Sequence, residues 1–335
     1  MRVLAGDLGG THARFAVVEV EPAGGQRGQR ARARVMRDAT LSSRDAPGLA
    51  ALARGFLEVV GEPPPSRACF GVAGPVRDGE AHTTNLPWSI NARAVGEAIG
   101  IPHTSLINDF EAVGHGLLLL QDSDLVTLQP GEPPEHGPIA VIGAGTGLGE
   151  GYLVWDRSVY RVHSSEGGHA TFAAQGPIEW QLCAYLAERF GHVSYERVLS
   201  GPGLVNIYQY LAAAAEAAPA APMLEEMRRE DPAAVISRHG LAGSDPLAVS
   251  ALDLFVSVYG AQAGNLALTI LASGGVYLAG GIAPRVVEKL KSGAFLSAFR
   301  RKGRLSELLA RVPVHVIMNP DVGLLGAAAV AAADR

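Results

Sequence analysis

The chain has 335 residues, of which 48% are hydrophobic and 18% charged, a composition typical of a globular protein and not of a disordered one. That length suits two domains or one large one with an ample core. The net charge of −5 gives no electrostatic footprint for nucleic-acid binding. No apolar run reaches about 18 residues, so we expect no transmembrane helix and no membrane partner.

The start of the chain and its two cysteines favour a cytoplasmic protein. The first predicted strand begins at residue 3, which leaves no room for a signal peptide. Two cysteines, Cys69 and Cys183, cannot form a framework of disulfides, and both lie in apolar runs. We therefore expect reduced thiols in a reducing compartment.

Residues 3–18 form two apolar runs joined by a glycine-rich turn, which predicts two antiparallel strands in a hairpin. Gly9 and Gly10 lack a Cβ, so a ligand can approach the backbone, and successive N–H groups there form an anion-binding concavity. Asp7 ends the first strand, where a carboxylate can hold Mg²⁺ directly or through water, and Thr11 adds a hydroxyl. An ordinary hairpin with a polar tip is the alternative, because short glycine motifs have many false positives.

The lysines exclude two other kinds of phosphate site. The chain has only Lys289, Lys291 and Lys302. It has no G-x-x-x-x-G-K-[ST] motif, so it is not a P-loop protein, and no earlier lysine is available for a protein-kinase site. A nucleotide at the hairpin must therefore be held by backbone N–H groups and Mg²⁺.

The next elements alternate between helix and strand. Apolar spacing over 47–60 predicts a helix, and the run 68–73 predicts a buried strand. The segment 85–91 combines polar residues with an aromatic ring. It is either a surface loop with a helix cap or a loop that presents Asn85 and Asn91 to a small polar ligand, and the sequence leaves both interpretations open.

A strand over 104–107 leads into Asn108 and Asp109 at a predicted helix start. An N-cap explains one of these two residues. A carboxamide followed by a carboxylate at the carboxyl end of a strand also matches the place where α/β sheets bind ligands. From the local pattern alone, capping is the simpler interpretation.

Residues 139–154 repeat the pattern of the first hairpin, with Gly145 and Thr146 in the turn between two apolar runs. The glycine spacing is not G-x-G-x-x-G, and the strand-to-strand context argues against a Rossmann site. A repeated hairpin of this kind indicates an internally duplicated fold.

The second half of the chain adds a polar segment and a third glycine-bounded strand. The segment 164–169 follows a strand and ends at His169, which we expect not to bind zinc because no cysteine lies near enough to complete a site. The glycine-bounded strand lies within 274–284. The other predicted elements are helices over 177–190, 204–215, 246–271 and 323–333 and a strand over 312–318.

Together these motifs resemble the actin, Hsp70 and hexokinase superfamily. Three segments resemble the phosphate-1, phosphate-2 and adenosine motifs of that superfamily, namely residues 6–11, 145–147 and 274–281. Four segments resemble motifs of bacterial glucokinases that lack the cysteine-cluster zinc motif, namely residues 107–110, 165–169, 196–203 and 280–285. The resemblance runs from about residue 3 to residue 330, and one departure is His12, where such glucokinases usually carry Asn.

The resemblance implies an α/β fold of two actin-like ATPase (ribonuclease H-like) domains around a central cleft. Residues 1–109 and about 320–335 would form the small domain, and 110–319 the large one. It implies ATP-dependent phosphorylation of glucose on its 6-hydroxyl, feeding glycolysis, with Asp109 as general base and Mg²⁺ held by Asp7. The resemblance also implies a homodimer without bound zinc.

The same resemblance implies the remaining roles residue by residue. Those implied to bind glucose are Asn85, Asn91, Asn108, Asp109, Glu166, His169 and Glu196. Those implied to bind ATP are Gly6, Asp7, Leu8, Gly9, Gly10, Thr11, Gly145, Thr146, Gly280 and Gly281. Asn108 and Asp109 would then lie at the hinge and face the cleft, which replaces the capping-only interpretation.

Two rival classes share part of this pattern, an ATP-driven chaperone of the same superfamily and a sugar-responsive regulator. A regulator needs a DNA-binding segment, for which there is no room before residue 3. A chaperone needs a peptide-binding domain, which we do not expect after the closing helix. We therefore expect glucose and ATP as partners.

Overall fold

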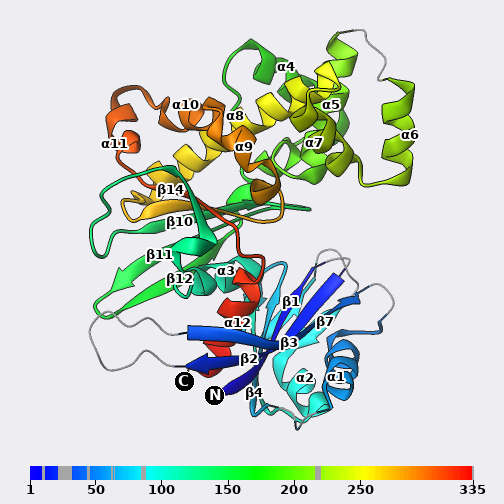
Figure 1. Ribbon diagram of the computed structural model, residues 1–335, viewed down its shortest axis with the longest axis vertical. Helices are drawn as coiled ribbons and strands as arrows, with labels where there is room; N and C mark the ends of the chain where they lie inside the picture. The colour runs from blue at the N-terminus through cyan, green and yellow to red at the C-terminus, as the bar shows by residue number, and fades with distance from the viewer. Residues whose placement is uncertain are drawn as a thin grey trace. The chain divides into compact units, whose positions relative to one another are not determined.

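The structure, a computed structural model, describes residues 1–9, 12–21, 32–43, 46–61, 63, 65–83, 88–215 and 220–333. The chain divides into two compact units (Figure 1). Unit 1 contains Met1–Asp124, Val162–Ser164 and Asn319–Arg335, and unit 2 contains Leu125–Arg161 and Ser165–Met318. The first boundary between the two units therefore falls after helix α3 (Asp109–Leu117), so α3 belongs to unit 1.

Unit 1 is built on a five-stranded sheet in the order β3-β2-β1-β4-β8. The strands are β1 Arg2–Leu8, β2 His12–Glu21, β3 Arg32–Ser42, β4 Arg67–Val72 and β8 His103–Asn108. β1 and β2 are antiparallel, whereas β4 runs parallel to β1 and β8 parallel to β4. The predicted N-terminal hairpin and the buried strand near residue 70 are confirmed.

The two faces of this sheet are covered by different helices, because successive side chains of a strand point to opposite faces. On one face, Phe70 of β4 and Phe15 of β2 pack with Phe56 of α1 (Leu49–Val60). On the other face, the next residue, Gly71, lies against Ala112 of α3. Smaller elements complete the unit: α2 Ala92–Ile99, η1 Asp122–Asp124 and the sheet of β5 Val76–Arg77, β6 Glu80–His82 and β7 Ser89–Asn91.

The closing helix α12 (Val322–Ala332) returns to unit 1 and packs on α3 at unusually short range (Figure 1, red helix). A Cβ added at Gly326 would collide with the backbone oxygen of Ala112, and one added at Gly116 would collide with that of Val322. These glycines let the two helices approach until backbone meets backbone.

Unit 2 repeats the arrangement of strands, with a six-stranded sheet in the order β12-β11-β10-β13-β14-β9. The strands are β9 Leu125–Gln129, β10 Ile139–Ala144, β11 Leu148–Asp156, β12 Val159–Ser165, β13 Gly275–Ala279 and β14 Val314–Ile317. Within β12, Val162–Ser164 are the residues that are grouped with unit 1. β10 and β11 form the predicted second hairpin, and β13 and β14 run parallel to β10. In both units an antiparallel hairpin is thus followed by parallel strands, which confirms the predicted duplication.

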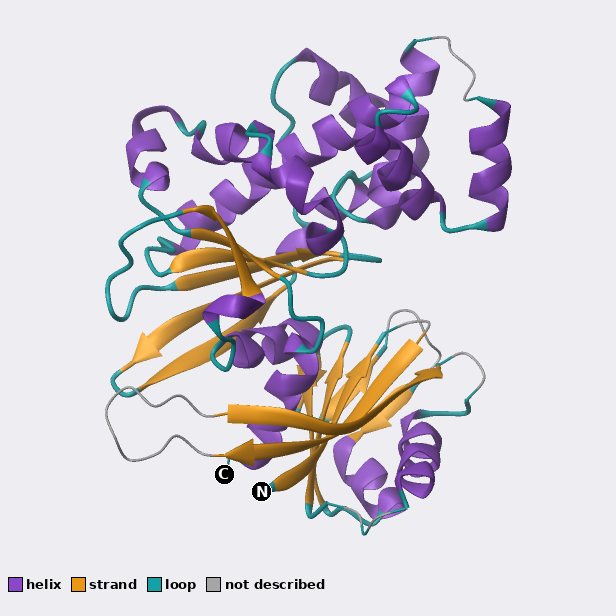
Figure 2. Cartoon of the chain, in the orientation of Figure 1, coloured by secondary structure: helices purple, strands orange, loops and turns teal. Residues whose placement is uncertain are grey.

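The helices of unit 2 lie on one side of its sheet (Figure 2). They are α4 Pro177–Phe190, α5 Gly201–Ala214, α6 Ala221–Arg229, α7 Pro232–Ala242, α8 Pro246–Ile270, α9 Val287–Lys291, α10 Ala294–Arg300 and α11 Ser306–Ala310. The 3-10 segments are η2 Gly167–His169, η3 Tyr195–Arg197, η4 Ala283–Val286 and η5 Gly303–Leu305. The predicted helices at α4, α5, α8 and α12 are confirmed.

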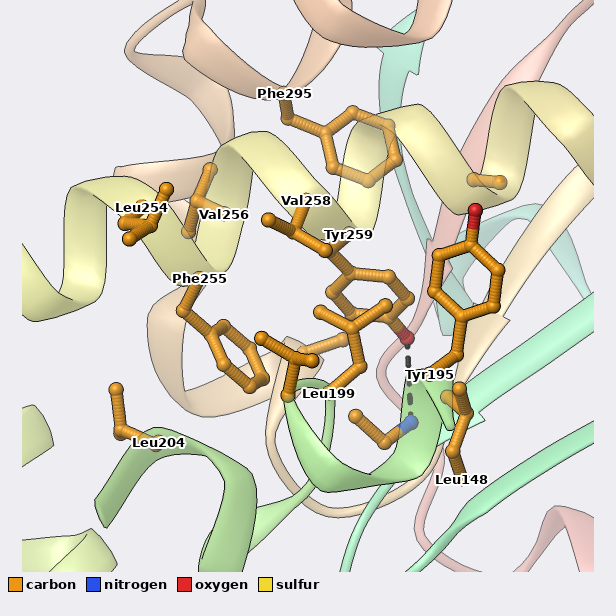
Figure 3. Packing of buried hydrophobic residues seen from close by; sticks show 14 of the residues in the cluster. Leu148, Tyr195, Leu199, Leu204, Leu254, Phe255, Val256, Val258, Tyr259 and Phe295 are labelled. Atoms are coloured by element: carbon orange, nitrogen blue, oxygen red, sulfur yellow. Dashed lines mark hydrogen bonds between the residues drawn. The ribbon is translucent and has the colours of Figure 1, made fainter. Parts of the chain in front are cut away.

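The long helix α8 runs through the core of unit 2, where Phe255 and Tyr259 pack with Leu199 and Phe295 (Figure 3). By length and composition α8 could cross a membrane, but 67% of its most apolar window is buried inside the protein. Such burial is typical of a core helix, because the rest of unit 2 covers the apolar surface of α8.

The close approach of α12 to α3 gives a prediction of stability. Gly326→Ala should lower the free energy of unfolding by about 1–3 kcal/mol, because the added methyl meets backbone that cannot rotate away. The measurement is the midpoint of urea unfolding by circular dichroism. The control is Gly55→Ala in α1, where a Cβ meets nothing within 4 Å. It should stabilise the protein by about 0.4–1 kcal/mol, and an equal effect of both substitutions would contradict the packing argument.

Candidate active site

The sheet of unit 1 brings its polar residues to one edge. The strand register places Asp7 of β1 opposite Gly71 of β4, and Gly71 opposite Ile107 of β8. Neighbouring strands lie about 4.8 Å apart, so Asp7 and the residues that end β8 are about 10 Å apart across the sheet. Gly71 between them carries no side chain. The carboxyl ends of β1, β4 and β8 therefore form the ligand-binding edge expected of an α/β sheet.

Asn108 caps helix α3, as the local pattern predicted. Its Oδ1 accepts hydrogen bonds from the backbone nitrogens of Phe110 at 2.9 Å and Glu111 at 3.2 Å. Its Nδ2 donates to the backbone oxygen of Gly74 at 3.1 Å. An amide nitrogen carries two hydrogens, so one of them remains for a ligand.

Asp109 follows the cap at the first position of α3. It is half-buried, and its Oδ1 accepts from the backbone nitrogen of Phe110 at 3.0 Å. Asn108 accepts from two backbone nitrogens of the helix start and Asp109 from one of the same two. The capping role thus falls mainly on Asn108, and capping alone does not account for the carboxylate beside it.

Asn91 is also a helix cap. Its Oδ1 accepts from the backbone nitrogen of Ala94 at 3.0 Å, and its Nδ2 donates to Oε1 of Glu80 at 2.9 Å. The capping interpretation of this residue is confirmed. Asn85, in the same predicted loop, lies outside the described residues, as do Gly10 and Thr11 of the first hairpin.

The first hairpin carries a cluster of charges around Asp7. Arg14 lies directly opposite Asp7 in the register of β1 and β2. Its guanidinium pairs with Asp38 of β3 at 2.9 Å and with Asp321 at 2.5 Å. Three carboxylates thus surround one guanidinium, so the cluster is net negative. The ion pair of Arg14 with Asp321 ties β2 to the start of α12. Asp7 of β1 lies beside the same helix start, since a Cβ at Gly323 would lie 3.5 Å from its Oδ2.

The chemistry of this cluster fits Mg²⁺, which keeps several waters and uses one or two protein carboxylates together with substrate phosphates. Asp7 is exposed and supplies one such carboxylate. In the described ranges no group of three or more His, Cys, Asp or Glu side chains is arranged to hold a metal. An Asp7 site would therefore depend on the phosphates of the nucleotide.

Three further residues of this hairpin, Gly6, Leu8 and Gly9, present no side chain to a nucleotide. A Cβ at Gly6 would lie 2.5 Å from the ring of Phe70, so this glycine makes room for the core. The side chain of Leu8 is buried as well. Gly9 donates to the backbone oxygen of His12 at 3.0 Å, which closes the turn without using the His12 side chain.

The second hairpin presents bare backbone at the end of β10. A Cβ at Gly145 would meet no atom within 4 Å, and Thr146 is exposed. Tyr259 of α8 forms hydrogen bonds to this strand end from the core of unit 2 (Figure 3). Its hydroxyl accepts from the backbone nitrogen of Ala144 at 3.3 Å and donates to the backbone oxygen of Ile142 at 3.3 Å.

The turn after β13 is joined to the same strand end. Gly280 has a φ of 79°, and a Cβ there would lie 2.5 Å from the backbone oxygen of Ala144. That oxygen also accepts from the backbone nitrogen of Ile282 at 3.2 Å. Gly281 beside it has nothing within 4 Å of its Cβ position, so a ligand can approach its backbone. The phosphate-2 and adenosine motifs are therefore adjacent.

Glu196 lies in the 3-10 helix η3, directly beside the second hairpin. Its Oε2 accepts from the backbone nitrogen of Leu148 at 3.0 Å. A second link joins the two segments, since Gly201 donates to the backbone oxygen of Gly145 at 2.8 Å. The sequence had placed Glu196 and the hairpin in separate motifs, and the fold brings them together.

Glu166 and His169 lie at the two ends of the short segment η2. Their side chains are 60% and 61% exposed, and the atoms Oε2 and Nε2 are 3.9 Å apart, which is too far for a hydrogen bond. Gly168 between them is buried against the backbone oxygen of Leu148. The segment is thus fixed by its glycine, and its two polar side chains remain available to a ligand.

A buried polar network lies beneath these segments, and sequence reasoning missed it. Glu150 of β11, only 3% exposed, accepts from Nε2 of Gln262 at 2.8 Å. Asn265 donates to Oε1 of Gln262 at 3.2 Å and to the Tyr195 hydroxyl at 2.9 Å. Lys302 donates to Oδ1 of Asn265 at 2.5 Å. The available signal was the pair of amides three residues apart on an otherwise apolar helix.

This network supports both candidate sugar-binding segments. Oε2 of Glu150 lies directly against Gly167, where any Cβ would collide with it. At the other end, Tyr195 is the neighbour of Glu196 in η3. Burial raises the pKa of the Glu150 carboxyl, and the hydrogen bond from Gln262 opposes that rise.

The sheets and their glycine turns define the class of the protein: an actin-like ATPase fold with the hairpins of a sugar kinase. The family model for glucokinase matches residues 4–334. A glucokinase of Nostoc punctiforme is 42% identical over 343 residues, which cover 98% of each chain. The chain belongs to the glucokinase family, the enzymes that phosphorylate glucose with ATP.

Solved structures agree with this assignment. A glucokinase from an Antarctic psychrotroph is 33% identical, covers 98% of each chain and superposes with a TM-score of 0.82. A ROK-family glucokinase from Streptomyces griseus, solved with glucose and AMPPNP, has a TM-score of 0.69 over 99% of each chain. At 21% identity the second likeness shows the fold alone.

The buried carboxyl of Glu150 gives a prediction of pH dependence. Because its pKa is raised on folding, the folded protein keeps this proton to higher pH than the unfolded chain. Its contribution to stability is therefore present at low pH and is lost as the pH rises through the folded pKa. Glu150→Gln removes this loss, so its free energy of unfolding relative to wild type should increase with pH.

The measurement is urea unfolding of both proteins at several pH values from about 4.5 upward, the range above the ordinary pKa of a glutamate. The control is Glu288→Gln, which changes a surface glutamate that pairs with Lys291. A stability difference between Glu150→Gln and wild type that is independent of pH would contradict the assigned burial effect.

Proposed function

We propose that this glucokinase transfers the γ-phosphoryl group of ATP to the 6-hydroxyl of glucose, with Asp109 as general base. The observation that carries the assignment of the base is the edge of the unit 1 sheet. There Asp109, at the end of β8, lies two strands from Asp7, at the end of β1. The Streptomyces griseus glucokinase, solved in complex with glucose and AMPPNP, supports the choice of the two substrates.

In this mechanism the 6-hydroxyl oxygen attacks the γ-phosphorus while the bond to the ADP oxygen breaks. The hydroxyl proton passes to the carboxylate of Asp109. Positioning and charge stabilisation supply most of the catalysis in phosphoryl transfer. When bound, Mg²⁺ would neutralise charge on the phosphates, and Asp7 would hold it through water.

The nucleotide would be held mainly by backbone. The undescribed Gly10 and Thr11 would donate from the first hairpin, and Thr146 from the second. The N–H groups of Gly9 and Gly145 close their own turns, so these two glycines would instead leave room for the phosphates. Gly280 and Gly281 would let the adenosine approach the turn after β13. This arrangement needs no lysine, which is consistent with a chain whose first lysine is Lys289.

Glucose would be recognised by polar side chains that form hydrogen bonds with its hydroxyls. The side chains proposed for this role are Asn85, Asn91, Asn108, Asp109, Glu166, His169 and Glu196. A carboxylate suits this role because its two oxygens accept from two hydroxyls at once. The resemblance to bacterial glucokinases further supports a cytoplasmic, homodimeric enzyme that feeds glycolysis and contains no zinc.

Asp109→Asn should lower kcat by about 10²–10⁴-fold, the usual contribution of a general base, while glucose affinity changes much less. The amide keeps the shape and loses the ability to take a proton. Steady-state kinetics of ADP release measure this, and Asp122→Asn, in the exposed η1, is the control. A near wild-type kcat in Asp109→Asn would remove this residue from the chemistry.

The choice of sugar tests the whole site. A buried polar group left without its hydroxyl costs about 1–3 kcal/mol, or roughly 5- to 150-fold in kcat/KM. Mannose and galactose should therefore be phosphorylated much less efficiently than glucose. The measurement is kcat/KM for the three sugars with ATP. Equal values of kcat/KM for the three sugars would indicate a generic hexose kinase. A rate of ADP release that does not depend on added sugar would favour the chaperone class.

A further inference from the structure

The second hairpin and the segment that carries Glu196 are joined so closely that they form one structural piece. Two hydrogen bonds connect them, from the Leu148 nitrogen to Oε2 of Glu196 and from the Gly201 nitrogen to the Gly145 oxygen. Ser200 locks the backbone between these links, since its Oγ donates to the backbone oxygen of Glu196 at 2.8 Å. Any movement of the hairpin must therefore move this segment.

Gly147 explains how the carboxylate reaches the hairpin. A Cβ at this position would lie 2.6 Å from Oε2 of Glu196. The backbone of Gly147 does not have the positive φ that favours glycine. Its missing side chain is thus needed for the approach of Glu196, and the conformation of the turn does not require it.

The hydrogen bond from Leu148 gives the two carboxylate oxygens of Glu196 different roles. Oε2 is engaged by the hairpin, whereas Oε1 has no hydrogen bond within the part of the chain that the structure describes. Glu196 is half-buried, so the amide of Leu148 fixes the rotamer from which Oε1 would meet a sugar hydroxyl.

We propose that the second phosphate hairpin positions Glu196 for glucose, through the N–H of Leu148 and the space left by Gly147. This inference rests on the proposed role of Glu196 as a sugar ligand. Leu148 and Gly147 are positioning residues, because they act on the sugar only through that carboxylate. A hairpin that moves with the nucleotide would also change glucose affinity, and glucose would change nucleotide affinity by the same factor.

Gly147→Ala is the direct test, because the new methyl displaces a flexible carboxylate and leaves the backbone conformation allowed. The KM for glucose should rise by about 10- to 100-fold, the range for losing a hydrogen bond to a charged group. The KM for ATP should change by less than about twofold, well below that range. Gly145→Ala is the matched contrast on the same turn. Its Cβ enters open space, so it should affect the KM for ATP and not that for glucose.

A double-mutant cycle with Glu196→Ala separates this inference from the proposed function. Removing the Glu196 side chain removes the atoms that the new methyl meets, so Gly147→Ala should add nothing further to the KM for glucose in that background. Unchanged glucose KM in Glu196→Ala alone would refute the sugar-binding role of Glu196.

If Glu196→Ala raises the KM for glucose but Gly147→Ala does not, the sugar role stands and the positioning inference fails. The inference also fails if Gly147→Ala has its full effect without the Glu196 side chain. An equal rise in the KM for ATP and glucose would likewise overturn it, because the substitution would then act on the hairpin as a whole. Thermal unfolding of each variant excludes global destabilisation as the cause.

Discussion

Unit 2 depends on the hydrogen bonds that backbone groups make at the end of β10. The Ala144 nitrogen and oxygen are taken by Tyr259 and Ile282, and the Gly145 oxygen by Gly201. Each bond recruits a different segment: the core helix α8, the turn after β13 and the start of α5. Because buried backbone groups must be paired, this strand end cannot shift without breaking contacts to all three.

The constraint in unit 1 is different, because there the closing helix supplies it. The backbone-to-backbone approach of α12 and α3 depends on Gly116 and Gly326. Arg14 then pairs with Asp321 just before α12, so the last part of the chain is held against the first hairpin. The N-terminal turn of α12 and the carboxylate of Asp7 become neighbours as a result. The two similar sheets thus support their glycine hairpins in two different ways.

Both supports would help a chain with few lysines to bind phosphates through its backbone. Backbone donors hold an anion only where they are fixed in direction, since a floppy turn loses their combined field. Tyr259 fixes the second hairpin from within the core, and the ion pairs of Arg14 fix the surroundings of the first. The buried network from Glu150 to Lys302 extends the same rigidity to the segments of Glu166 and Glu196.

Local sequence patterns were enough to predict the two hairpins, the buried strand β4, the helices α4, α5, α8 and α12, and the duplication. These are local features, because alternation, helical spacing and glycine turns are written in neighbouring residues. The same patterns also pointed to the caps at Asn91 and Asn108. They missed β9 and the helices α6, α7 and α9 to α11; of these, α9 and α11 have five residues each, too few to show a helical period.

The contacts between residues far apart in the chain depend on the packing of the folded protein. Glu196 and Leu148 are separated by 48 residues, and Gln262 and Glu150 by 112. Pairs so far apart are brought together by the packing of whole helices and strands, and no local pattern specifies them. The glycines show the same division, since the sequence marks Gly6 and Gly147 alike as parts of a phosphate turn. Packing makes the first a space for Phe70 and the second a space for a carboxylate.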